Sequence, residues 1–190
     1  MHVIAGRFKG SSIHSARHET RPTTDRTKEA IFSYLEARSY LNNTSVLDLF
    51  AGTGALGIEA LSRGSATLVS VESSVPAAKL IAQNLTQLKN HADWEDHMHA
   101  KVVRATAQKY IDKIDECYDV IFLDPPYALS TDDCNALLQV IIEKKRISEQ
   151  GILILERSAR SQAPQIPEGW HVDSEKKYGE TAVFYIIADE

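Results

Sequence analysis

The sequence predicts a doubly wound α/β fold with a mostly parallel sheet, an antiparallel hairpin at its edge and a small N-terminal extension. Three observations indicate this fold. Apolar runs such as SVLDLF, YDVIFL and GILILE lack strict polar alternation, which is typical of parallel strands covered on both faces. Segments with helical periodicity separate these runs. The chain has 190 residues, 43% hydrophobic and 25% charged, which is the balance of one globular domain.

The first part of the chain is expected to hold little strand and one helix. Short β-prone pieces occupy residues 2–4 and 12–14. A helix is predicted over residues 25–37, with Thr24 as its N-cap and an apolar stripe formed by Ala30, Ile31, Tyr34 and Leu35. We expect residues 1–40 to form a basic extension ending in this helix, and residues 41–190 to form the ligand-binding domain as one unit.

The remaining elements are predicted in alternating order. Strands are expected at residues 45–50, 66–72, 101–105, 118–123 and 151–156. Helices are expected from the loop 51–57 to about Arg63, over residues 75–89 and over residues 132–145. Residues 170–188 are predicted to form two antiparallel strands joined near Gly179.

The charge distribution is uneven. The formal net charge of -5 argues against a protein that binds polyanions by bulk charge alone. Residues 1–28, however, carry six Lys or Arg against two acids, a local charge of +4, whereas the remainder carries -9. A basic arm on an acidic body suggests either a contact with an anionic partner or a solvated tail.

Other sequence signals exclude several classes of protein. Cys117 and Cys134 have no companions at metal-binding or disulfide spacing, and the seven histidines are scattered, so no metal site is expected. The start MHVIAGRFKG has no long apolar stretch, and no run reaches the length of a membrane span. We therefore expect a cytoplasmic protein that does not bind membranes.

A glycine-rich turn follows the first expected strand of the sheet. Gly52, Gly54 and Gly57 form a G-x-G-x-x-G pattern between a strand and a helix, and Glu72 lies twenty residues beyond Gly52. Such a turn brings backbone N–H groups close to a ligand, and the acid can accept both hydroxyls of a ribose. This pattern alone fits a dinucleotide or S-adenosylmethionine. Asp48, inside the preceding strand, favours the latter, because an acid attracts a sulfonium and an ammonium group but repels a pyrophosphate.

The sequence DPPY follows the apolar run YDVIFL and predicts a binding site for a planar amine. Asp124 and the backbone carbonyl of Pro125 can accept hydrogen bonds from an exocyclic NH2 group, which aims the nitrogen lone pair at a methyl donor. Pro125 and Pro126 fix the backbone, and Tyr127 offers a face on which a base stacks. Whether Asp124 also takes the proton stays open. The base must be flipped or unpaired to reach such a pocket.

Five segments together resemble one known family. AGRFKG, RPTTDRTKEAIFSYL, VLDLFAGTGALGIEALSRG, DPPY and KKYGET are similar to the bacterial small-subunit ribosomal RNA guanine-N2 methyltransferases that act on guanine 966 of 16S rRNA. The resemblance implies a Rossmann-like methyltransferase fold, S-adenosylmethionine as cofactor, and 16S rRNA in the small ribosomal subunit or its assembly intermediate as partner. A monomer is expected.

The resemblance and the motifs together give a list of expected site residues. The expected donor pocket consists of Asp48, Phe50, Ala51, Gly52, Thr53, Gly54, Glu72 and Thr106, with Thr106 standing where many methyltransferases have an adenine-binding acid. The expected catalytic turn consists of Asp124, Pro125, Pro126 and Tyr127. The basic arm is expected to contact RNA phosphates through Arg7, Lys9, Arg21, Arg26 and Lys28.

Three other functions share parts of this pattern. A DNA adenine-N6 methyltransferase would carry the same glycine turn and DPPY, although 190 residues leave little room for target-recognition elements. A nicotinamide-dependent oxidoreductase would share the glycine turn alone. A non-catalytic RNA-binding relative would keep the basic arm but lose DPPY.

Overall fold

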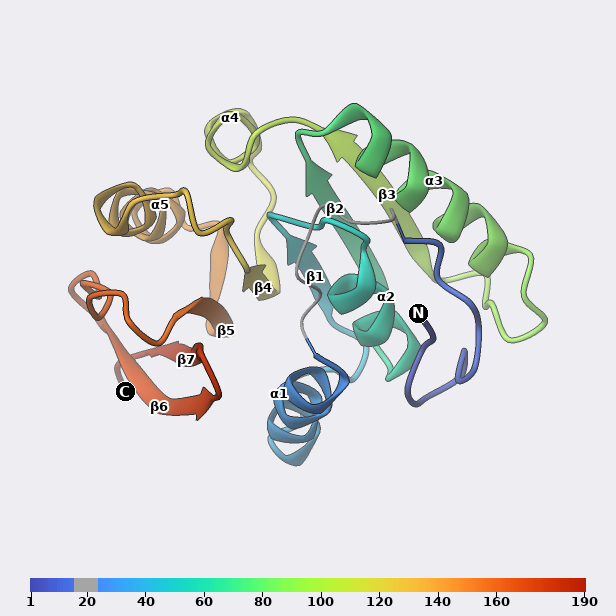
Figure 1. Ribbon diagram of the computed structural model, residues 1–190, viewed down its shortest axis with the longest axis horizontal. Helices are drawn as coiled ribbons and strands as arrows, with labels where there is room; N and C mark the ends of the chain where they lie inside the picture. The colour runs from blue at the N-terminus through green and yellow to red at the C-terminus, as the bar shows by residue number, and fades with distance from the viewer. Residues whose placement is uncertain (16–23) are drawn as a thin grey trace.

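The computed structural model describes residues 1–15 and 24–190, which form a seven-stranded sheet with helices on both faces (Figure 1). The strand order is β3-β2-β1-β4-β5-β7-β6. The strands are β1 (Ser45–Asp48), β2 (Thr67–Glu72), β3 (His99–Arg104), β4 (Tyr118–Leu123), β5 (Ile147–Ser158), β6 (Trp170–Tyr178) and β7 (Thr181–Ala188). The helices are α1 (Asp25–Ala37), α2 (Ala55–Ser62), α3 (Val75–Lys89), α4 (Ala107–Lys113) and α5 (Thr131–Glu143).

The predicted doubly wound sheet is confirmed. Strands β1 to β5 pair in parallel, and β7 pairs antiparallel with both β5 and β6, so the closing hairpin forms the edge of the sheet. Successive residues of β1 point to opposite faces, as a strand requires. Val46 packs with the core under α1, α2 and α3, whereas Leu47 packs with the core under α4 and α5. Apolar runs without alternation therefore supply two cores at once.

Among the helices and the strands of the sheet, two elements differ most from the expectation. Helix α4 was not predicted, because its seven residues are too few to show a helical period. Strand β5 begins at Ile147 rather than at residue 151. The apolar run did not predict this start, because the first residues of the strand include the exposed polar residues Glu149 and Gln150. Helix α1, in contrast, has the predicted bounds, and Thr24 caps it by accepting a hydrogen bond from the Thr27 N–H.

The N-terminal extension is anchored to the sheet's helices by buried polar groups. The N–H groups of Ile4 and Ala5 donate to the two carboxylate oxygens of Glu59 in α2, at 2.9 and 3.0 Å. Gly6 has φ +83°, and a Cβ there would lie 2.0 Å from the Ser62 carbonyl oxygen, so only glycine fits this contact. Residues 2–4 and 12–14 contribute a single bridge, His2 to Ser12, rather than strands. The division of the chain at residue 40 stays a prediction.

Helix α1 joins the same anchor through charges. Lys28 of α1 approaches Glu59, with a distance of 3.7 Å between Nζ and Oε2. Arg63, at the end of α2, approaches the same carboxylate, with a distance of 2.9 Å between Nε and Oε1. All three side chains are almost fully buried. None of the helices in the described ranges combines the length and the apolar character that crossing a membrane requires.

Candidate active site

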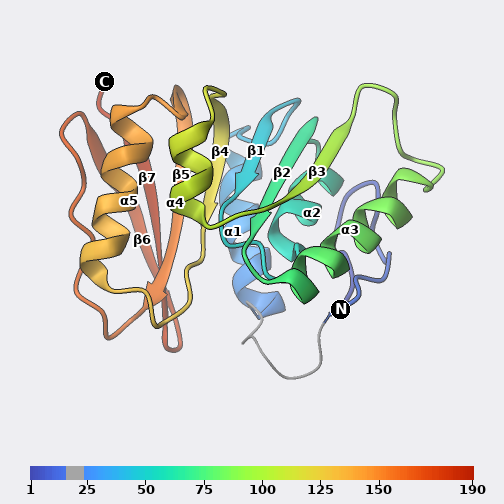
Figure 2. The same cartoon turned by 90° about the horizontal axis from the view of Figure 1, so that it is seen from above.

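The glycine turn and the DPPY turn start side by side at the carboxyl edge of the sheet. Strands β1 and β4 are adjacent and parallel, with Asp48 paired to Phe122. The Leu49 N–H donates to the Phe122 carbonyl at 3.1 Å, immediately before both turns begin. Neighbouring strands lie about 4.8 Å apart. The end of β1 and the end of β4 therefore lie side by side (Figure 2). In open α/β sheets, ligands bind in the crevice outside this edge.

The glycine turn depends on backbone conformations that other residues rarely adopt. Gly52 and Gly54 have φ values of +56° and +81°, and Gly54 is the N-cap of α2 without any side-chain cap. The turn is tied to the next strand, because the Ala51 N–H donates to the Val71 carbonyl at 3.0 Å. Thr53 lies partly exposed between the two glycines, and Phe50 lies partly buried before them. The N–H groups at the start of α2 thus border the crevice.

The Glu72 carboxylate is fixed at the end of β2 by two backbone donors. Its Oε2 accepts from the Gly52 N–H and its Oε1 from the Ser74 N–H, both at 2.8 Å. An ionised carboxylate has about four lone-pair sites, so these two bonds leave acceptor capacity for two hydroxyl groups. The contact with Gly52 places Glu72 at the glycine turn, as the twenty-residue spacing predicts. This geometry fits a ribose.

Asp48 is a buried acid with an unsatisfied oxygen. Its side chain is 1% exposed, and its Oδ1 has no hydrogen-bond partner among the residues that the structure describes. Burial, together with the nearby carboxylates of Asp124 and Glu72, raises the pKa of Asp48 to about 7, although backbone hydrogen bonds from Gly57 and Phe50 act to lower it. Three acids facing one crevice favour a cation and repel an anion. The residues therefore fit the sulfonium and ammonium groups of S-adenosylmethionine and do not fit a pyrophosphate.

The DPPY turn carries one acid and one aromatic ring. Asp124 is half-buried and Pro125 is buried, whereas Pro126 is exposed and the Tyr127 side chain is 61% exposed. The Leu129 N–H donates to the Pro126 carbonyl at 2.9 Å and closes the turn. An exposed ring held on a closed turn is suited to stacking on a planar group that enters from solvent. Asp124 lies close enough to Asp48 to raise its pKa, so the DPPY turn and the expected donor pocket are neighbours.

The basic arm is only partly as expected. Lys9 and Arg26 are exposed, and Arg7 is 24% exposed with its Nη1 2.6 Å from the Glu95 carboxylate. The prediction that Lys28 contacts RNA is wrong, because its side chain is 1% exposed and lies between Asp25 and Glu59. Local sequence could not reveal this, since the buried acid that binds Lys28 lies 31 residues away. Arg21 lies outside the described residues.

Two further residues bear on the donor pocket. Thr106 is the N-cap of α4 and accepts from the Lys109 N–H at 3.3 Å, so its oxygen already has a structural use. Asn84 of α3, which belongs to no predicted site motif, is 2% exposed. Its Nδ2 donates to the carbonyls of His14 and Thr53, at 3.0 and 3.4 Å. It therefore ties the end of the N-terminal arm to the glycine turn. An Asn inside a helix gives no signal for such a contact.

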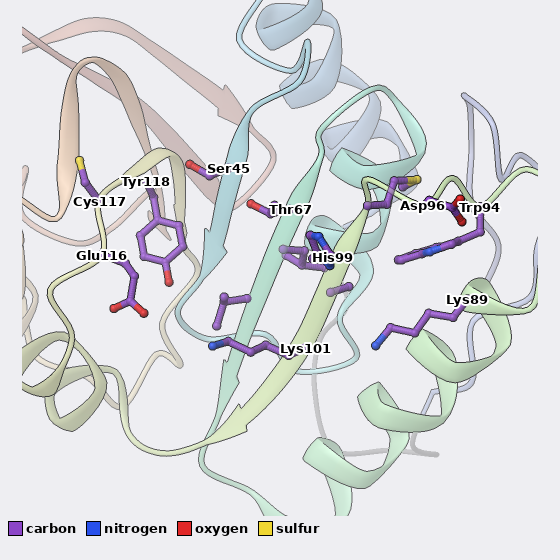
Figure 3. Close-up of a pocket in the computed structure, with 14 residues that line it drawn as sticks. Ser45, Thr67, Lys89, Trp94, Asp96, His99, Lys101, Glu116, Cys117 and Tyr118 are labelled. Atoms are coloured by element: carbon purple, nitrogen blue, oxygen red, sulfur yellow. The ribbon is translucent and has the colours of Figure 1, made fainter.

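A cavity of about 730 Å³ lies at the opposite edge of the sheet. Its lining includes the first residues of four parallel strands, Ser45, Thr67, His99 and Tyr118 (Figure 3). The amino ends of parallel strands lie together, away from the turns that follow the carboxyl ends. This cavity is therefore separate from the crevice formed by the glycine turn and DPPY. Within the described ranges, no group of three His, Cys, Asp or Glu residues could hold a metal ion.

Comparison with known proteins gives the family. A family model described as Conserved hypothetical protein 95 matches residues 1–187. The chain belongs to this family. It is 36% identical over 187 residues to a Bacillus subtilis protein provisionally named as an rRNA methyltransferase, YlbH, and the match covers 96% of each chain. It is also 26% identical to the ribosomal RNA small subunit methyltransferase D of Escherichia coli K12, covering 95% of this chain and 86% of that one.

Solved structures agree with this membership. A provisionally named methyltransferase from Escherichia coli, yhhF, superposes with a TM-score of 0.84 and 26% identity over 100% of this chain and 98% of that one. A Thermus thermophilus hypothetical protein superposes with a TM-score of 0.81 at 25% identity, over 99% of each chain. The resemblance stated from the motifs and the Rossmann-like methyltransferase fold are confirmed.

Proposed function

We propose that this protein transfers a methyl group from S-adenosylmethionine to the exocyclic N2 amine of a guanine in small-subunit ribosomal RNA, at guanine 966 of 16S rRNA. The observation that carries the proposal is the shared crevice of the glycine turn and DPPY, lined by Asp48, Glu72 and Asp124. Two full-length relatives have names that specify rRNA methylation, which supports an RNA rather than a DNA acceptor.

Each residue has a distinct task in the proposed reaction. Glu72 and the turn around Gly52 hold the ribose and methionine parts of the donor, and Asp48 faces its positive charge. The bound donor supplies an electrophilic methyl group. Asp124 accepts a hydrogen bond from the guanine amine and turns its lone pair toward that methyl group. Tyr127 stacks on the flipped base, a contact worth about 1–3 kcal/mol per base.

The proposed substrate is 16S rRNA within the small subunit or an assembly intermediate, and the protein acts as a monomer in the cytoplasm. Exposed Lys9 and Arg26, together with Arg7 once its pairing with Glu95 is exchanged for a phosphate, would position the RNA without reading its sequence. Base identity is left to the pocket. Because a paired base cannot reach Asp124, the target is unpaired or flipped.

The test is methylation of small subunits isolated from cells that lack this protein, with labelled S-adenosylmethionine, followed by mass mapping of the modified nucleoside. We expect N2-methylguanosine at one position and no transfer to duplex DNA. The Asp124→Asn chain is the matched control, because it keeps the shape of the side chain but loses the charged acceptor. Methyl transfer to DNA adenine would establish the alternative methyltransferase, and binding of NADH in place of S-adenosylmethionine would establish an oxidoreductase.

A further inference from the structure

Arg157 is a buried cation beside the DPPY turn that the proposed chemistry does not use. It lies near the carboxyl end of β5, the strand next to β4, and is 7% exposed. It pairs with Ala182 of β7, and Ala182 packs in the core under α4 and α5, so the Arg157 side chain lies on the α5 face of the sheet. From there its Nη2 donates a hydrogen bond to the Leu129 carbonyl at 3.0 Å.

Leu129 is the residue through which the catalytic turn is closed. Its N–H donates to the Pro126 carbonyl at 2.9 Å, and its own carbonyl accepts from Arg157. The next residue, Ser130, caps α5 by accepting from the Asp133 N–H at 3.0 Å. Tyr127 lies between the two ends of this closed turn and projects into solvent. The direction of its ring therefore depends on a backbone held at Pro126, Leu129 and Ser130.

The buried position of Arg157 is unfavourable for a charged side chain unless a specific contact compensates for the lost hydration. Burying a guanidinium removes its hydration, and an apolar side chain would fill the same space without that cost. Arg157 also lies near the first turn of α5, since its charge lowers the pKa of the Cys134 thiol, which burial raises. A helix N-terminus disfavours a cation, although Asp132 and Asp133 in the same turn offset this effect. The hydrogen bond to the Leu129 carbonyl is a contact that a guanidinium makes here and an apolar side chain could not make.

We infer that Arg157 is a positioning residue for the methyl acceptor: its hydrogen bond to the Leu129 carbonyl holds the DPPY turn in the conformation that aligns Asp124 and Tyr127 with the base. The inference rests on the proposed function. A side chain at the end of β5 thereby orients residues that follow β4, and does so without touching the substrate. The donor pocket lies on the other side of β4 from β5, at β1 and β2, so Arg157 affects acceptor geometry and leaves donor binding unchanged.

The test compares Arg157→Met with Arg160→Met. Arg160 is the matched control, because it follows the same strand but is 85% exposed and pairs with Glu180. We expect Arg157→Met to lower kcat for undermodified small subunits at least about tenfold, to leave the Kd for S-adenosylmethionine within about twofold, and to speed hydrogen exchange of the Leu129 amide. Arg160→Met should change none of the three. A folded Arg157→Met chain with unchanged kcat, or one whose donor affinity falls in parallel with kcat, would overturn the inference.

Arg157→Lys keeps the test decisive if the methionine variant does not fold. Lysine retains the charge, but its single ammonium does not reproduce the reach and the planar fork of the guanidinium. Faster Leu129 exchange together with a lower kcat supports the inference, and wild-type values of both reject it. A wild-type chain that methylates no small subunit would reject the proposed function instead. The Leu129 exchange needs no substrate, so it tests the contact in either case.

Discussion

Donor binding should release a proton from Asp48. Burial and two neighbouring carboxylates raise the pKa of this acid to about 7 in the free protein, where its Oδ1 has no hydrogen-bond partner within residues 1–15 and 24–190. A cationic ligand beside the carboxylate stabilises the ionised form and lowers that pKa. If Asp48 is ionised in the complex, raising the pH from about 6 to about 8 should increase donor affinity about tenfold, with most of the change below about pH 7.

The stability of the folded protein without ligand should fall as the pH rises, whereas donor affinity should increase. The unfolded chain loses the Asp48 proton near pH 4, whereas the folded chain holds it until about pH 7. The contribution of this group to the free energy of unfolding is therefore complete below the unfolded pKa and is lost as the pH rises through about 7. Saturating donor should restore the lost stability, because binding favours the ionised acid.

Calorimetry in buffers with different ionisation enthalpies measures the released proton directly. The control is Asp48→Asn, in which the amide takes the place of the carboxylate and can still accept the backbone hydrogen bonds from Gly57 and Phe50. The ligand's own titration is common to both chains. We expect similar affinities at about pH 6, where Asp48 is mostly neutral, and tighter binding by the wild type at about pH 8. Equal proton release in the two chains, or parallel pH profiles, would refute the assignment of the titration to Asp48.

Three further changes test the donor pocket and the basic arm. Glu72→Ala should weaken donor binding by about 1.5–3 kcal/mol, the range for a charged hydrogen bond, and calorimetry that finds unchanged affinity removes Glu72 from the pocket. Lys28→Met should lower the free energy of unfolding, measured in urea, by about 1–3 kcal/mol, because Glu59 loses one of its cations. The affinity for RNA should not change. Weaker RNA binding by a folded variant would show that Lys28 does contact RNA. Neutralising Arg7 and Lys9 should reduce the salt slope of RNA binding by about 1.4 if each contacts one phosphate. The same loss of charge at Lys144 and Lys145, which follow α5 at the amino edge of the sheet, should leave the slope unaltered, and equal effects of the two pairs would mean that bulk charge drives binding.

The strand and helix pattern could be predicted because it depends on local sequence. Thr24 begins α1 as expected, and α3 spans the predicted residues 75–89, since capping and a helical apolar stripe both lie within a few residues of the element they define. Helix α4 could not be predicted, because its seven residues are too few to show a helical period. The polar start of β5 could not be predicted either, because Glu149 and Gln150 belong to the strand through its pairing with β4 and not through their composition.

Side-chain roles were predictable only where the motif itself contains the partners. Gly52 and Glu72 are brought together by a spacing that a βαβ unit imposes, so their hydrogen bond could be expected. Lys28, in contrast, looked like one more cation in a basic segment. Its burial is decided by Glu59 and Asp25, and the sequence does not show that the arm, α1 and α2 converge on one carboxylate.

The sequence by itself determined the fold class, the identity of the two turns and the charge preference of the donor pocket, because these follow from residues close together in the chain and from strand order rules that parallel sheets obey. The tertiary structure decided which polar groups hold those turns in place. Asn84 joins the arm to the glycine turn, and Arg157 reaches Leu129 from a neighbouring strand. Such contacts form between residues that are 28 to 70 positions apart, where only the packing of strands and helices brings donor and acceptor within hydrogen-bond distance.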